Sequence, residues 1–194
     1  MRKNDSAASE RGAVSKSKYR SAAREIAYIA LAVSLITVCA WITLPLGPIP
    51  FTLQTLAVAL VGALLGWKRG VAAVAVYIFM GLIGIPVFSR FQATTALFGT
   101  TGGYIFGFLF LALGPALAKL LPIKNVWARA GIVYAGMVLG MVIMYFFGTV
   151  WYANLSGTGF VASLTVCVVP FILPDLVKFV ISAFLAVKLE KYVR

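Results

Sequence analysis

Long runs of apolar residues alternate with short polar or charged segments along almost the whole chain. A helix needs about 17 to 25 apolar residues to cross the ~30 Å hydrocarbon core of a bilayer. Six runs reach that length or come close to it, and they cover residues 25–44, 51–67, 70–88, 102–121, 127–151 and 160–188. The second and third runs meet at Trp67–Gly70, where we expect a tight turn at a membrane interface. The pattern therefore predicts an all-α membrane protein with six transmembrane helices.

The composition supports the membrane class and narrows the chemistry. With 62% hydrophobic and 11% charged residues and a mean hydropathy of +1.00, the chain is more apolar than a soluble domain, whose apolar share is about half. The sequence contains no His, and its two Cys residues, Cys39 and Cys167, lie inside apolar runs. This predicts neither a metal site nor a disulfide framework. An intramembrane enzyme would need a nucleophile with a base, or a metal, so we expect a protein that is not an enzyme.

The charge pattern predicts the orientation in the membrane. A net charge of +12 would suggest nucleic-acid binding in a soluble protein, but here the charges gather at the ends of the runs. Fifteen of the 17 Lys and Arg residues lie in the N-terminal tail, near residue 68, between the fourth and fifth runs, or at the C-terminus. Cytoplasmic loops are rich in such residues. We therefore expect a multi-pass protein of the cytoplasmic membrane with both termini inside and no nucleic-acid partner. Residues 1–24 would form a flexible basic tail near lipid headgroups, and residues 25–194 the six-helix domain.

Two connections on the outer side carry candidate pocket residues. The first, residues 44–55, has three prolines and no charge, so it forms either a lid or pocket wall or a rigid connector. Thr52 and Gln54 lie in it near the membrane boundary. The second connection ends in Gly102–Tyr104, whose adjacent glycines allow either tight packing or backbone N–H contacts to a ligand. The chain has no Walker-type phosphate loop, so we expect no ATP hydrolysis by that route.

Small residues recur on one face of the first run. Ala23, Ala27, Ala30 and Ser34 follow one another at intervals of three or four residues, which places them on one side of a helix. In membranes such faces let helix backbones approach closely. The face is therefore expected either to pack inside the bundle or to dock a partner protein.

Asp175 and Lys178 stand three residues apart within the sixth run. Because an isolated charge in the bilayer is costly, such residues usually face the protein interior and pair with each other or with a ligand. Pro170 and Pro174 interrupt the run just before Asp175, and broken helices occur at membrane depth where they line a cavity. Both side chains would project from one helix face, ~4.5 Å apart along the axis. They form either a structural ion pair or a site for a small solute with amide-like and anionic groups.

Four motifs carry a resemblance to a known family. They are PFTLQT at 50–55, GIPVF at 84–88, GGYIFGF at 102–108 and PDLVK at 174–178. In this order, and over most of the chain beyond the tail, they resemble the BioY family, the biotin-binding S components of energy-coupling-factor (ECF) transporters. The resemblance implies an S-component-like bundle of six helices, which captures biotin from outside in a pocket covered by the two outer connections. It implies no cofactor, because biotin is the transported substrate.

The resemblance also implies roles for individual residues. Asp175 would accept hydrogen bonds from the ureido ring of biotin, and Lys178 would serve either the ureido oxygen or the carboxylate. The loop around Arg90 is poorer in glycine than the family pattern, and Arg90 becomes a second candidate for the carboxylate. The expected substrate-binding residues are Asp175, Lys178, Thr52, Gln54, Arg90, Gly102, Gly103 and Tyr104.

Family members work with two cytoplasmic ATPases and a transmembrane coupling protein, which dock through small residues. This implies a docking role for Ala23, Ala27, Ala30 and Ser34. Some members are proposed to act without this module, and the sequence does not separate the two cases. The nearest rival is an S component for another vitamin, although a Lys in the site argues against a cationic substrate such as thiamine. A small channel would need polar residues through several runs, and the second and third runs lack them.

Overall fold

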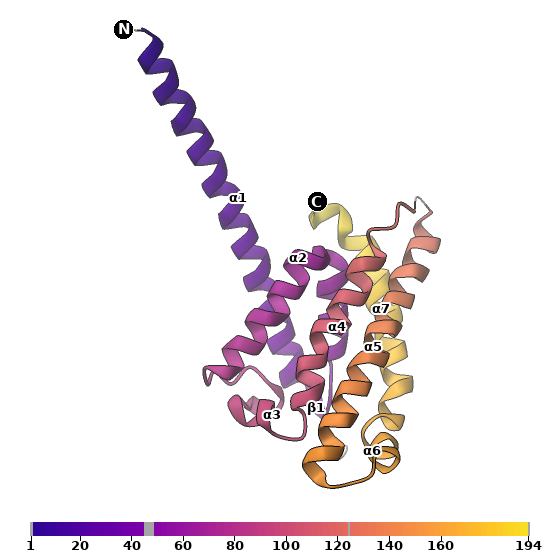
Figure 1. Ribbon diagram of the computed structural model, residues 1–194. Coiled ribbons are helices and arrows are strands. Elements are labelled where there is room, and N and C mark those ends of the chain that lie inside the picture. The colour runs from indigo at the N-terminus through magenta and orange to yellow at the C-terminus, as the bar shows by residue number, and fades with distance from the viewer. Residues whose placement is uncertain (1, 45–48, 124, 194) are drawn as a thin grey trace.

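The computed structural model describes residues 2–44, 49–123 and 125–193, which form a bundle of helices (Figure 1). The helices are α1 Arg2–Trp41, α2 Gln54–Leu82, α3 Thr94–Phe98, α4 Gly102–Ala118, α5 Val126–Ser156, α6 Phe160–Cys167 and α7 Val169–Val193, with a 3₁₀ turn at Ser89–Phe91. Two short strands, β1 Thr43–Leu44 and β2 Phe51–Thr52, pair antiparallel with Thr43 opposite Thr52. The all-α class predicted from the sequence is confirmed.

Helix α2 is a hairpin of two limbs rather than one continuous rod. Gly66 has a left-handed φ of 74°, which breaks the helix just before Trp67. A Cβ built on Gly70 would lie 3.0 Å from the Cα of Gly62, an approach that only a reversal of the chain allows. The turn expected at Trp67–Gly70 is therefore present, and the two limbs correspond to the second and third apolar runs.

The remaining apolar runs fold with different boundaries from those predicted. By length and composition, four helical segments among the described residues reach the length that crosses a membrane: Ala22–Trp41, Gln54–Leu82, Val126–Ser156 and Val169–Tyr192. Gln54–Leu82 reaches it only as a whole, because the chain reverses at Gly66 and each of its two limbs is shorter. Helix α4 is apolar but shorter. The sixth run is divided into α6 and α7 at Val168, so the break comes before Pro170 and Pro174 rather than at them. Pro170 fits in the first turn of α7 because an N–H group there has no helical partner. The number of six membrane spans stays a prediction.

The connections between the long helices lie at two opposite ends of the bundle. Figure 1 shows the turn of α2, the α4–α5 connection and the chain termini toward one end, and the strands, α3 and α6 at the other. The basic segments of the sequence therefore share one end, as the predicted orientation requires, although the side of the membrane stays a prediction. Helix α1 continues through residues 2–24 and extends beyond the bundle. The flexibility of that segment also stays a prediction.

Helices α4 and α5 pack with their backbones nearly in contact. A Cβ on Gly114 would lie 2.1 Å from the carbonyl oxygen of Gly136, and one on Gly140 would lie 2.7 Å from that of Phe110. Both spacings are too short for any side chain. In membranes such small residues let helices approach closely enough for dense van der Waals contact. The two helices therefore form one rigid wall of the bundle.

The small-residue face of α1 does not pack inside the bundle. Ala23, Ala27, Ala30 and Ser34 are all exposed, whereas Ile36 and Ala40 on another face are fully buried. Of the two interpretations open from the sequence, internal packing is therefore wrong for this chain. Docking of a partner stays a prediction.

Ion pairs join the helices at the end that holds the basic segments. Glu190 of α7 accepts a hydrogen bond from Arg129 of α5 at 2.6 Å, and Lys119 lies 3.5 Å from the same oxygen. Arg69 in the turn of α2 pairs with Glu25 of α1. One set of contacts joins the end of α7 to α5 and to the residue that follows α4, and the other joins the turn of α2 to α1.

Candidate functional site

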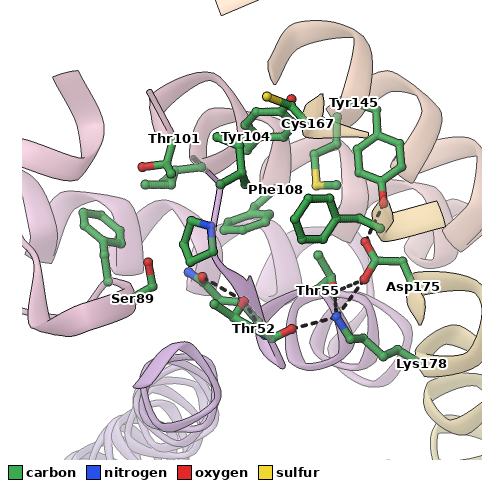
Figure 2. Close-up of a pocket in the computed structure, with 17 residues that line it drawn as sticks. Thr52, Thr55, Ser89, Thr101, Tyr104, Phe108, Tyr145, Cys167, Asp175 and Lys178 are labelled. Carbon is green, nitrogen blue, oxygen red and sulfur yellow. Dashed lines mark hydrogen bonds and ion pairs between the residues drawn. The ribbon is translucent and has the colours of Figure 1, made fainter. Parts of the chain in front are cut away.

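A pocket of about 580 Å³, its open mouth included, lies among β2, α4, α5 and α7 (Figure 2). The polar side chains on its wall belong to Thr52, Gln54, Thr55, Ser89, Thr101, Tyr104, Tyr145, Asp175 and Lys178. Most of the remaining wall is apolar and includes Ile49, Phe88, Ile105, Phe108, Met144 and Phe171. A mostly apolar wall with polar groups in a few places suits a compact organic ligand.

Asp175 and Lys178 form a buried ion pair on the pocket wall. The two residues are 3% and 5% exposed, and Lys178 Nζ lies 2.8 Å from Asp175 Oδ1. Asp175 Oδ1 also accepts a hydrogen bond from the Thr55 hydroxyl at 2.9 Å, and Oδ2 accepts one from the Tyr145 hydroxyl at 2.7 Å. The carboxylate is thus held in one orientation by donors from three different helices, α2, α5 and α7.

Lys178 connects helix α7 to the β hairpin. Its Nζ donates to the backbone carbonyl oxygen of Thr52 at 2.7 Å and lies 3.3 Å from the Thr55 hydroxyl. It also stands 3.9 Å from the centre of the Phe51 ring, within the range of a cation–π contact. The first outer connection therefore forms a wall of the pocket, which is one of the two roles expected for it from its prolines.

Thr52 and Gln54 hold the beginning of α2 against the second outer connection. The Gln54 backbone N–H donates to the Thr52 hydroxyl at 3.2 Å, and the Gln54 side-chain amide donates to the Tyr77 hydroxyl. Tyr77 in turn donates to the backbone carbonyl of Val87 at 3.0 Å. This chain of hydrogen bonds links both outer connections at the edge of the pocket.

The other residues expected in the site lie in three different places. Tyr104 lines the pocket and is 6% exposed, and its hydroxyl makes no hydrogen bond of standard geometry to any described residue. Gly102 and Gly103 are tightly packed, which is one of the two roles expected for them, because a Cβ on Gly102 would lie 2.0 Å from the Leu97 carbonyl oxygen and one on Gly103 would meet Trp151. Arg90 lines a separate pocket beside the main one.

Two polar residues of the network were not expected from the sequence. Thr55 is the last residue of the PFTLQT motif and directly follows Gln54, and this position gave no separate signal. Tyr145 stands in the middle of α5, where a tyrosine in an apolar run looks like ordinary core. Only the three-dimensional structure, which places its hydroxyl on Asp175, identifies it.

Several known proteins are similar to this chain over most of its length. The model of the BioY family matches residues 9–194. The biotin transporter BioY of Thermotoga maritima is 39% identical over 172 residues, which are 87% of this chain and 96% of that protein. The probable biotin transporter BioY of Pyrococcus horikoshii is 35% identical over 87% of this chain and 97% of its own length.

A solved structure has the same fold. The crystal structure of the S-component for biotin from an ECF-type ABC transporter superposes with a TM-score of 0.78 and 25% sequence identity. The match covers 90% of this chain and 98% of that chain. The likeness therefore extends over nearly the whole bundle.

Proposed function

Because this chain belongs to the BioY family, we propose that it captures biotin and takes it up across the cell membrane, as the substrate-binding S component of an ECF transporter. Its relatives are biotin transporters, so the chain is a transport protein and not an enzyme. The observation that carries the proposal is the buried Asp175–Lys178 pair on the wall of a mostly apolar pocket. An alternative is an S component for another vitamin, and the binding experiment below distinguishes it.

The charge balance of the site indicates how biotin would be oriented. Asp175 and Lys178 neutralise each other, and a ligand carboxylate beside them would leave one negative charge uncompensated in a buried place. The neutral ureido ring has two N–H donors and one carbonyl, so it suits an acceptor beside a donor. We therefore assign the ureido ring to the Asp175–Lys178 end, with its N–H groups on Asp175 and its oxygen toward Lys178. The carboxylate would point toward the outer connections.

Calorimetric titration of the purified protein with biotin in detergent tests both the ligand and the site. We expect tight binding by the wild type and a loss of about 100-fold or more in Asp175→Asn and in Lys178→Ala, because each removes a charged partner. Glu190→Gln is the matched control, since it neutralises the other carboxylate of α7. Binding that survives both pocket substitutions would make the pair structural. An absence of binding by the wild type would direct the search to other vitamins.

The proposal includes a topology. Six spans would cross the membrane, α1, the two limbs of α2, α4, α5 and α6–α7, with both termini in the cytoplasm and residues 1–24 as a basic tail. The gathering of the basic segments at one end supports this orientation. Cysteine labelling from outside the cell would test it, because a Cys at Gln92 should react whereas one at Lys68 should not.

The exposed small-residue face of α1 is proposed to dock the transmembrane coupling protein, which works with two ATPase subunits. Its exposure in the isolated chain supports a partner there. Bulky substitutions, Ala27→Trp and Ala30→Trp, should reduce co-purification with the module, whereas Leu35→Trp on another exposed face of the same helix should not. If all three variants co-purify equally, α1 is not the docking helix. The same experiment shows whether the chain forms a complex with the module or acts without it.

A further inference from the structure

A second pocket lies beside the main one at its outer end. It encloses about 390 Å³, its open mouth included, and its wall contains Arg90, Gln92, Thr95 and Thr100. Pro50 and Thr101 line both pockets, so the two spaces adjoin. Figure 2 shows Ser89 and Thr101 at the side of the main pocket away from Asp175 and Lys178. The second pocket, which we call the outer pocket, is thus reached from the end of the main pocket opposite the buried ion pair.

The turn that carries Arg90 is held by several independent contacts. Arg90 and Phe91 have φ values of 57° and 56°, in the left-handed region that non-glycine residues rarely adopt. Phe91 packs on Trp41 with ring centres 5.0 Å apart, and Trp41 Nε1 donates to the Pro86 carbonyl at 3.1 Å. Such a conformation persists only where the surroundings determine it, and it is most common at functional sites.

This turn directs two consecutive side chains into the two pockets. Ser89 is buried and lines the main pocket, whereas Arg90 is exposed and lines the outer pocket. Backbone hydrogen bonds close the turn, from Phe88 N to the Gln92 carbonyl at 3.0 Å and from Gln92 N to the Ser89 carbonyl at 3.2 Å. The backbone of Arg90 is therefore held at a fixed place, from which its side chain lines the outer pocket.

Within the described part of the chain, no carboxylate pairs with Arg90. Asp175 is engaged by Lys178, and Glu25 and Glu190 are engaged by basic residues of other segments. The guanidinium offers five N–H donors in a fork that matches an oxyanion. The Gln92 amide and the threonine hydroxyls add neutral hydrogen-bonding groups on the same wall.

We propose that the outer pocket is an entry site for the ligand carboxylate, which Arg90 attracts and holds while the rest of the ligand moves into the main pocket. This inference rests on the proposed function, because biotin supplies both the carboxylate and the neutral ring. Arg90 then acts on the rate of association more than on the final complex. A charge at the rim of a site typically changes the association rate and its salt dependence rather than the dissociation rate.

Stopped-flow tryptophan fluorescence in a neutral detergent tests the entry site with two ligands, biotin and its uncharged carboxamide. We expect Arg90→Gln to lower the association rate constant of biotin about two- to fivefold at low salt, with the difference fading at high salt. The rate constant for the carboxamide and both dissociation rate constants should stay unchanged. Lys68→Gln is the matched control, because it removes one exposed positive charge in the turn of α2 at the other end of the bundle.

The outcomes separate this inference from the proposed function. Equal slowing of biotin and carboxamide, or no slowing of either, would overturn the entry site while leaving biotin binding intact. An effect of Arg90 that appears only in membranes with anionic lipid would assign the guanidinium to a lipid phosphate and would also overturn it. A wild type that binds neither ligand would overturn both the proposed function and the inference that rests on it.

Discussion

Helix α7 carries two clusters of charged side chains that differ in what surrounds them. Near its beginning, Asp175 pairs with Lys178 on the wall of the main pocket and accepts hydrogen bonds from two hydroxyls. Near its end, Glu190 pairs with Arg129 and lies 3.5 Å from Lys119 Nζ. Among the described residues, Glu190 does not belong to the wall of the main pocket. Both carboxylates are largely shielded from solvent. Burial and pairing alone therefore do not identify a ligand site. A pocket beside the ion pair is also needed, and only the Asp175–Lys178 pair has one among the described residues.

The two clusters also differ in the kind of partner they hold. Glu190 is matched by Arg and Lys from α4–α5, so it joins the ends of neighbouring helices. Asp175 is matched by Lys178 of its own helix and by neutral hydroxyls from α2 and α5. Because these hydroxyls carry no charge, the negative charge of Asp175 is balanced by Lys178 alone. Such a cluster is able to exchange its hydrogen bonds with a neutral ligand without leaving a free charge.

The largest effect is expected at the Asp175–Lys178 pair, where two variants distinguish the contribution to stability from the contribution to biotin binding. Lys178→Met leaves the Asp175 carboxylate buried without its cation, and we expect a loss of about 3–5 kcal/mol in stability as well as the loss of biotin binding. Adding Asp175→Asn removes the uncompensated charge and should restore most of the stability but none of the binding. Thermal unfolding in detergent and calorimetric titration measure the two quantities. A double variant that binds biotin like the wild type would show that the pair is structural.

A smaller effect is expected at the hydroxyl that α5 contributes. Tyr145→Phe removes one hydrogen bond to a charged acceptor, which is typically worth about 1.5–3 kcal/mol. Since the carboxylate would lose part of its fixed orientation, we expect biotin affinity to fall about tenfold. Tyr134→Phe is the control on the same helix, because Tyr134 does not line the pocket. Equal affinities in the two variants would remove Tyr145 from the binding site.

The smallest effect is expected at the second cluster. Glu190→Gln weakens the contacts with Arg129 and Lys119 but keeps the shape of the side chain and one hydrogen-bond acceptor, so we expect a loss of about 1.5 kcal/mol in stability, at the lower end for a hydrogen bond between charged groups. The dissociation constant for biotin should not change, because Glu190 lies at the other end of α7. Thermal unfolding and titration again provide the two readings. A marked loss of affinity in this variant would mean that the two ends of α7 are coupled.

The sequence was sufficient for the class of fold and for the pairing of Asp175 with Lys178. Apolar runs and the placement of basic residues predict a helical membrane protein, and the three-residue spacing of Asp175 and Lys178 predicts a shared face. These signals are local, so they do not depend on how distant segments meet. Thr52, Gln54 and Tyr104 also line the pocket as expected.

The parts of the site that could not be predicted from the sequence depend on contacts between distant segments. The hydroxyl of Tyr145 meets a carboxylate 30 residues away in the chain, and no periodic pattern encodes that meeting. Gly102 and Gly103 pack closely against Leu97 and Trp151, partners that the sequence did not name, whereas contact of these glycines with the ligand stays a prediction. Arg90 was expected in the same site as Lys178, and the left-handed turn places it in a neighbouring pocket instead.

The reversal of α2 at Gly66 has a consequence for the surrounding lipid. The second limb, residues 67–82, is about 24 Å long at 1.5 Å per residue, whereas the hydrocarbon core of a bilayer is about 30 Å thick. Val76, Phe79 and Leu82 on this limb are exposed, so in the proposed topology acyl chains would contact it directly. A hydrophobic segment shorter than its surroundings draws the bilayer inward. The membrane beside this limb is therefore expected to be thinner than average, and lipids with shorter acyl chains should gather along it.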